Sequence, residues 1–201
     1  SEIENDLIEE TEEAEEDIES EEEVVLTDSP VLEGTSEVIT GTCGEECTYE
    51  IADGTLTISG SGAMNNYNYD SLPEWNRDAS QFTKIVVEEG ITTIGSYAFY
   101  KCSGLTIVTI PEGVMSIGNY AFEDCSSLTS VTIPESVTSI GIAAFANCDK
   151  LTEIEIPVGV TAISVSLFSG CNALKKIELK EGLKTIGSYA FEDCPSLEEI
   201  R

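Results

Sequence analysis

The sequence predicts a repeat solenoid, a stack of similar short coils that share one elongated core. This prediction depends on three columns of residues, each of which recurs at a constant step of 23 positions. The columns are cysteine (Cys102, Cys125, Cys148, Cys171 and Cys194), phenylalanine (Phe99, Phe122, Phe145, Phe168 and Phe191) and isoleucine (Ile94, Ile117, Ile140, Ile163 and Ile186). Fixed internal periods of roughly 20–50 residues are typical of stacked-coil proteins.

Residues 82–201 divide into five full units and a truncated sixth, with no gap in the register. The shared pattern is L-x-x-I-x-I-P-x-x-V-x-x-I-G-x-x-A-F-x-x-C-x-x. Its first part predicts a short strand in which alternate apolar side chains point inward. Proline ends this strand because it has no N–H group to donate to a ladder. The V-x-x-I that follows predicts a short second strand.

Each unit then turns a corner. Gly141 of the third unit fits a tight turn, where a positive φ costs glycine little. Ala144, Phe145 and Cys148 follow it and can share one face of a short helical or 3-10 turn. One coil cannot bury these faces alone, so the stacked coils must share a core. We therefore expect the phenylalanine and cysteine columns to form the structural core.

The pattern IPxxVxxIGxxAFxxC resembles the BspA-like leucine-rich repeat of bacterial surface proteins and of some protists. The segment GTCGEECTYEIADGTLTISGSGAM (41–64), with Pro73 and Trp75 after it, is similar to the stretch that often precedes such repeats. The resemblance implies a leucine-rich-repeat solenoid for residues 82–201. It also implies a secreted or cell-surface protein, with any signal peptide removed, that binds a protein or glycan in an adhesin-like role.

The departures from the pattern are local. In the fourth unit Ser164 replaces the glycine and Leu167 replaces the alanine, which predicts a distorted corner there. The first unit has Phe82 for leucine and Glu88 for proline, and the fifth has Lys180 for proline.

The N-terminal end of the chain is strongly acidic. The chain has 39 Asp and Glu against 9 Lys and Arg, a formal charge of −30, and 23 of the acidic residues precede Arg77, the first basic one. This composition predicts that residues 1–40 form a disordered tail or linker. A helix that packs against a partner is the alternative, because four apolar residues could share one helical face: Ile3, Leu7, Ala14 and Ile18.

Residues 41–81 predict an N-terminal β-hairpin cap. The strands TYEI and TLTI flank Ala52-Asp53-Gly54, so residues 48–58 are expected to form the hairpin. Trp75 and the tyrosines of the loop MNNYNYDSLPEW complete this cap. A cap is required because an uncovered first coil would expose its apolar edges.

The composition excludes several classes of function. Nucleic acids and anionic membrane surfaces both require clustered basic residues, and no apolar run is long enough to insert into a bilayer. The sequence contains no histidine, which removes histidine-dependent triads and Cys–His pairs. The pairs Glu123-Asp124 and Glu192-Asp193 lack the spacing of a calcium loop. We predict a monomer that is not an enzyme and that needs no cofactor or metal.

The cysteines fall into two groups. The five repeat cysteines are expected to be free, buried and unreactive, because apolar surroundings disfavour the thiolate. Cys43 and Cys47 precede the hairpin and are equally compatible with a small disulfide loop and with two reduced thiols.

The outward positions of the first strands are the candidates for contact with a ligand, since leucine-rich repeats usually bind partners on that face. The candidate positions are Lys84, Val86, Ile107, Thr109, Ser130, Thr132, Glu153, Glu155, Lys176 and Glu178. The first expectation is a binding module for a protein or glycan. The alternative is a structural spacer that displays another domain of a longer protein.

Overall fold

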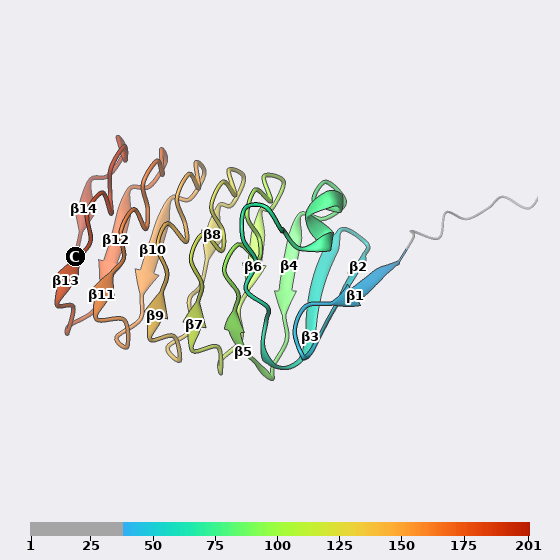
Figure 1. Cartoon of the computed structure of the whole chain (residues 1–201). Helices are drawn as coiled ribbons and strands as arrows, with labels where there is room; N and C mark the ends of the chain where they lie inside the picture. The colour runs from blue at the N-terminus through green and yellow to red at the C-terminus, as the bar shows by residue number, and fades with distance from the viewer. Residues whose placement is uncertain (1–37) are drawn as a thin grey trace, which may run out of the picture. The chain divides into compact units, whose positions relative to one another are not determined.

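The computed structural model describes residues 38–201 (Figure 1), and the predictions made for residues 1–37 lie outside this part. Two parallel ladders of short strands run along the stack. The first ladder contains β4 (Lys84–Val87), β6 (Ile107–Thr109), β8 (Ser130–Val131), β10 (Glu153–Ile156), β12 (Lys176–Leu179) and β14 (Glu199–Ile200). The second contains β5 (Ile91–Ile94), β7 (Ser116–Ile117), β9 (Ser139–Ile140), β11 (Ala162–Ile163) and β13 (Thr185–Ile186).

The step of 23 residues is the register of both ladders. In the first ladder Ile85 pairs with Val108, and Val108 pairs with Val131. In the second, Ile94 pairs with Ile117. Equivalent residues therefore stack directly, and the solenoid predicted from the sequence is confirmed.

The third side of each coil is a column of hydrogen-bonded turns. The N–H of Phe99 donates to Ala121 of the next coil at 2.8 Å, while the N–H of Cys102 donates to Phe99 of its own coil at 3.2 Å. Tyr97 and Lys101 have φ values of 56° and 59°, in the left-handed region, so a right-handed helical turn cannot continue through them. The expected short helical turn is therefore a run of tight turns, and alternate N–H groups in it link neighbouring coils.

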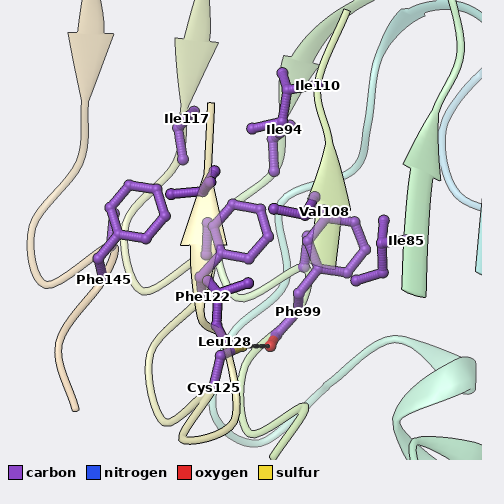
Figure 2. Packing of buried hydrophobic residues seen from close by; sticks show 14 of the residues in the cluster. Ile85, Ile94, Phe99, Val108, Ile110, Ile117, Phe122, Cys125, Leu128 and Phe145 are labelled. Atoms are coloured by element: carbon purple, nitrogen blue, oxygen red, sulfur yellow. Dashed lines mark hydrogen bonds between the residues drawn. The ribbon is translucent and has the colours of Figure 1, made fainter. Parts of the chain in front are cut away.

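The core is a column of stacked phenylalanine rings between the ladders and the turns (Figure 2). The ring centroids of Phe99 and Phe122 are 5.2 Å apart, and those of Phe122 and Phe145 are 5.3 Å apart. The column continues through Phe168 to Phe191, with 6.0 Å between successive centroids. Phe191 is only partly buried, and the four rings before it are fully buried.

The repeat cysteines line the same core and donate hydrogen bonds. The thiol of Cys125 donates to the carbonyl oxygen of Phe99 at 3.2 Å, and the thiols of Cys148 and Cys171 repeat this bond in the next coils. All five repeat cysteines are free, and only Cys194 is partly exposed. The thiols therefore have polar partners that the expectation of plain apolar packing did not include.

Alkylation of the repeat thiols should depend on unfolding. Burial raises the pKa of Cys102 to about 12 and that of Cys171 to about 12, so the reactive thiolate is scarce at pH 8.5 in the folded state. Iodoacetamide at pH 8.5 should label these thiols slowly before denaturation and label at least five groups after it. Mass spectrometry counts the labels, and fewer than five in the unfolded, unreduced chain would mean that the column is bridged.

The glycine of the corner is required by close packing and not by a positive φ. The prediction of a positive φ at Gly141 was wrong, since Gly141 is not among the glycines with that conformation. A Cβ atom at Gly141 would lie 2.4 Å from the backbone nitrogen of Asn119 in the preceding coil. At Gly118 it would lie 2.4 Å from that of Ser96. Only glycine lets successive coils approach this closely.

Substitution of Gly118 by alanine should therefore be destabilising. The added Cβ meets backbone atoms that cannot move alone, and we expect a loss of about 1–3 kcal/mol in the free energy of unfolding. Gly104→Ala is the matched control, because the nearest atoms to its Cβ would be 3.8 Å away. Urea denaturation should separate the two variants, and equal midpoints would contradict this account of the corner.

The N-terminal cap is an antiparallel sheet that leads into both ladders. Strands β1 (Ile39–Thr42), β2 (Glu46–Ala52) and β3 (Thr55–Ala63) pair in sequence order, and Ala52 pairs with Thr55. The hairpin is confirmed, with a loop of two residues where three were expected. Asp53 and Gly54 form it with φ values of 48° and 72°, as a type I′ turn requires.

Strand β3 also starts both parallel ladders, which the sequence did not reveal. Its first half pairs with β4 and its end pairs with β5. Gly60 and Gly62, with φ values of 109° and 81°, bend the strand between these two halves. This single strand therefore serves as the first turn of the solenoid.

Trp75 closes the phenylalanine column at the same end. It lies in η1 (Glu74–Asp78), a 3-10 helix that is the only helix within residues 38–201. The indole is fully buried, and its Nε1 donates to the carbonyl of Ala98 at 2.9 Å. Its ring packs against Tyr49, Tyr67 and Phe99, with centroids 4.9–6.1 Å away.

Cys43 and Cys47 are both free and buried inside this cap. The thiol of Cys47 donates to the carbonyl of Ser61 at 3.2 Å, and the N–H of Cys43 donates to the carbonyl of Cys47 at 2.9 Å. Burial and the neighbouring thiol of Cys47 raise the pKa of Cys43 to about 12. The structure thus corresponds to the reduced alternative, and the disulfide stays a prediction for oxidising conditions.

Candidate ligand-binding face

The candidate face is the outer surface of the first ladder. Along each of its strands the side chains alternate, so that Ile85, Val108 and Ile154 point into the core. The candidate positions occupy the other set and are exposed or half-buried: Lys84, Val86, Ile107, Thr109, Ser130, Thr132, Glu153, Glu155, Lys176 and Glu178. The ten positions therefore lie on one face, and whether a ligand contacts them stays a prediction.

Both ladders are interrupted between the third and fourth units. Pairing in the first ladder shortens from three residue pairs between β4 and β6 to two between β6 and β8. It is absent between β8 and β10, and in the second ladder β9 likewise does not pair with β11. Pairing resumes with four residue pairs between β10 and β12.

The column of turns crosses this junction without interruption. The N–H of Phe145 donates to Leu167 at 3.1 Å, and the N–H of Asn147 donates to Ser169 at 2.8 Å. The third and fourth coils are therefore joined by backbone hydrogen bonds at the turns, but strand pairing joins them in neither ladder.

Two substitutions of the repeat pattern, Ser164 and Leu167, lie in the fourth unit, next to this interruption. In the second, third and fifth coils the N–H of the corner glycine donates to the preceding coil, as from Gly141 to Ile117 at 2.9 Å. At Ser164 the side-chain hydroxyl makes the equivalent bond to Ile140 instead, because the Cβ of serine keeps the backbone from approaching as closely. The larger Leu167 is fully buried beside the phenylalanine column, and the centroid spacing is 6.0 Å on both sides of its coil, from Phe145 to Phe168 and from Phe168 to Phe191.

A surface hollow of about 420 Å³ lies at the interruption of the first ladder. Its sides are residues 130–135 of the third unit and residues 153–155 of the fourth. Side chains from neighbouring units complete it: Glu112, Pro157, Lys176 and Glu178. We call this feature the junction hollow, and six of the ten candidate positions line it.

Carboxylates dominate the rim of the junction hollow, where five glutamates and one lysine occur among the lining residues. Glu112 and Glu135 each accept a backbone N–H from the next coil, from Ser136 and Val158 respectively, both at 3.3 Å. The side chain of Glu153 has no ion-pair or hydrogen-bond partner among residues 38–201.

Two lysines offset the negative charge of the glutamates on the C-terminal side of the hollow. Lys180 forms ion pairs with Glu155 and Glu178, and Lys176 pairs with Glu178 at 3.4 Å. Hydrogen bonds from Lys180 and Lys176 hold the pKa of Glu178 below its ordinary value. Lys180 replaces the proline of the repeat pattern, so this departure supplies the charge that orders Glu155 and Glu178.

Sequence reasoning found the strands of this site but missed two of the five glutamates on its rim. Glu112 and Glu135 follow the proline of their units and were not candidates. The signal that could have located the hollow was the pair of substitutions at Ser164 and Leu167, which predicted a distorted corner but not the interruption of the ladders.

The described residues show no arrangement for metal binding. Within residues 38–201 no three His, Cys, Asp or Glu side chains are placed to hold a metal ion. No helix in the same part of the chain has the length and hydropathy needed to cross a membrane.

Parallel ladders with a 23-residue register, an inward phenylalanine column and an exposed strand face define a leucine-rich-repeat solenoid. The family model described as "BspA type Leucine rich repeat region" matches residues 77–201 in six copies. The chain belongs to this family of BspA-type leucine-rich-repeat proteins. A search of curated proteins found no sequence match.

Solved structures of bacterial leucine-rich-repeat proteins are similar to the chain. A protein from Eubacterium ventriosum is 32% identical over 82% of this chain and 44% of its own, with a TM-score of 0.74. One from Bacteroides ovatus is 28% identical over 82% and 51%, with a TM-score of 0.53. A leucine rich cell surface protein from Faecalibacterium prausnitzii is 27% identical over 81% and 54%, with a TM-score of 0.52. The chain spans about half the length of these structures.

Proposed function

We propose that the chain is a cell-surface protein-interaction module that binds an extracellular protein through the outer face of the first ladder. The observation that carries the proposal is the junction hollow. It is a concave site on the face where the strand side chains are exposed, and it lies where pairing in the first ladder is interrupted. Concave sites with apolar floors and a few polar groups are the usual places of recognition.

The comparisons support the location and the class of function. The chain belongs to a repeat family, and a similar structure is that of a leucine rich cell surface protein. A rigid stack of coils presents many side chains at fixed spacing, which suits binding of an extended surface. Since the sequence has no histidine and the face has no nucleophile paired with a base, we propose a role in binding without catalysis.

The test is a hollow-filling substitution on the full chain. The probes are a panel of purified extracellular matrix and plasma proteins, with binding measured by surface plasmon resonance. Thr132→Trp places a large ring in the junction hollow from an exposed position, and it should abolish binding to any panel member that the unmodified chain binds.

Thr161→Trp is the matched control, because Thr161 is an exposed threonine outside the first ladder. This variant should bind normally. Loss of binding in both variants, or in neither, would contradict a site on the first ladder. Absence of binding to the whole panel would favour the alternative role, a structural spacer in a longer surface protein.

A further inference from the structure

We propose that the junction hollow receives an arginine or lysine side chain from a basic segment of the partner protein. This inference rests on the proposed function, because it names the chemistry by which the same site would recognise a partner. Three features of the hollow carry it: the charge of its rim, the apolar character of its floor and the unpaired strand edges that border it.

The charge of the rim selects a cation. The lining residues contribute five carboxylates and a single ammonium group. Lys180 offsets part of this charge, but only on the side of Glu155 and Glu178. On the other side Glu135 and Glu153 line the hollow from adjacent units, and no basic side chain among the described residues pairs with either. A charged N–H donor placed between them would make charge-assisted hydrogen bonds.

The apolar floor of the hollow favours a side chain with a long aliphatic part. Val131, Ile133 and Ile154 point into the core and line the hollow only with the small part of their surface that stays exposed, less than a tenth of each residue. Pro134 and Pro157 flank them. A metal cation or a small ammonium ion would leave this apolar surface uncovered. Arginine and lysine combine a stem that packs on apolar surface with a charged head that stays at the polar rim.

The strand edges supply further acceptors. Because β8 does not pair with β10, carbonyl groups along their facing edges have no ladder partner. The hydroxyls of Ser130 and Thr132 lie on the same side of the hollow. A guanidinium group has five N–H donors, more than an ammonium, and therefore satisfies several such acceptors at once. We expect arginine to bind more tightly than lysine.

An acidic or phosphorylated partner would be repelled by the same rim. Interfaces place opposite charges across from each other, and charge complementarity sets the choice of partner more than the contact area does. The residue type that enters the hollow is thus opposite in charge to the chain, whose formal charge is −30.

The experiment must read out the site directly, because the acidic N-terminal residues would also attract cationic peptides. The probe is the blocked peptide acetyl-Gly-Arg-Arg-Gly-amide, titrated into the ¹⁵N-labelled full chain and followed by amide chemical shifts. Within residues 38–201 we expect saturable shifts confined to residues 130–135 and 153–155. The lysine peptide should bind more weakly, and the uncharged glutamine peptide should produce no shifts there.

Charge variants separate the hollow from general attraction. Glu153→Gln should weaken binding about fivefold, the effect of one exposed charge pair. Glu192→Gln is the control, because it makes the same change in charge at an exposed turn away from the hollow, and it should leave the affinity unchanged. Shifts spread over other acidic positions of residues 38–201, or equal effects of the two variants, would overturn the proposal.

The two proposals fail in different ways. If Thr132→Trp abolishes binding of a panel protein but the arginine peptide leaves residues 130–135 unshifted, the face binds its partner by another chemistry and this inference is wrong. If the peptide binds the hollow but Thr132→Trp does not affect any panel protein, the hollow recognises cations while the proposed function is wrong.

Discussion

Phe145→Ala is expected to lower the free energy of unfolding by about 3–5 kcal/mol. Phe145 is fully buried and stacks between Phe122 and Phe168, with centroids 5.3 Å and 6.0 Å away. Loss of the ring leaves a gap that the stacked coils cannot close, because their backbones are held by hydrogen bonds at the turns. Chemical denaturation followed by circular dichroism measures the loss.

The position of Phe145 also predicts a change in cooperativity. It lies at the junction where both ladders are already interrupted, so the phenylalanine column and the turns hold most of the connection there. Each coil is stabilised only by its neighbours, and the variant should unfold in two transitions. Thr132→Ala, on the exposed face of the same unit, should cost less than about 0.5 kcal/mol and keep one transition. Equal losses would mean that the inside and outside of the coil are wrongly assigned.

Trp75→Ala is also expected to lower the free energy of unfolding by about 3–5 kcal/mol, because it removes the largest buried side chain of the cap. The variant exposes Phe99, the first ring of the column, and leaves the carbonyl of Ala98 without its indole donor. Unfolding should therefore begin at the N-terminal coil, which hydrogen exchange of the β4 and β5 amides would detect.

Two further variants test this interpretation of Trp75. Trp75→Phe keeps an aromatic ring over Phe99 but loses the hydrogen bond from the indole to the carbonyl of Ala98. It should lower the free energy of unfolding by about 1–2 kcal/mol. Met115→Ala removes a side chain that is 53% exposed and should be close to neutral. If the alanine and phenylalanine variants of Trp75 are equally unstable, the hydrogen bond and not the ring is the main contribution of the cap.

The regular part of the fold could be predicted because the pattern repeats. Leu128, Val131 and Ile133 recur as apolar positions in every unit, and an error in the assignment of one unit would have been visible in the others. The same reasoning failed at Gly141, where a tight corner suggested a positive φ. The contact that requires glycine there comes from Asn119 in the preceding coil, and the sequence of one unit does not show how closely the coils approach.

The candidate face was predicted from the alternation of side chains along the strands, but its shape was not. Glu112 and Glu135 reach the junction hollow from turns, through bonds to the N–H groups of the next coil. Such contacts join residues 23 or 24 positions apart, and they depend on how the coils are stacked. No local pattern in either unit distinguishes these glutamates from other exposed ones.

The sequence by itself determined the solenoid, its register, the buried columns and the hairpin cap, because each depends on a local periodicity or a short turn signal. Only the tertiary structure decided that β3 starts both ladders, that the cysteine thiols donate to phenylalanine carbonyls and that both ladders are interrupted between the third and fourth units. The physical reason is that these features arise between coils, where differences of a few tenths of an ångström in backbone spacing decide whether hydrogen bonds form.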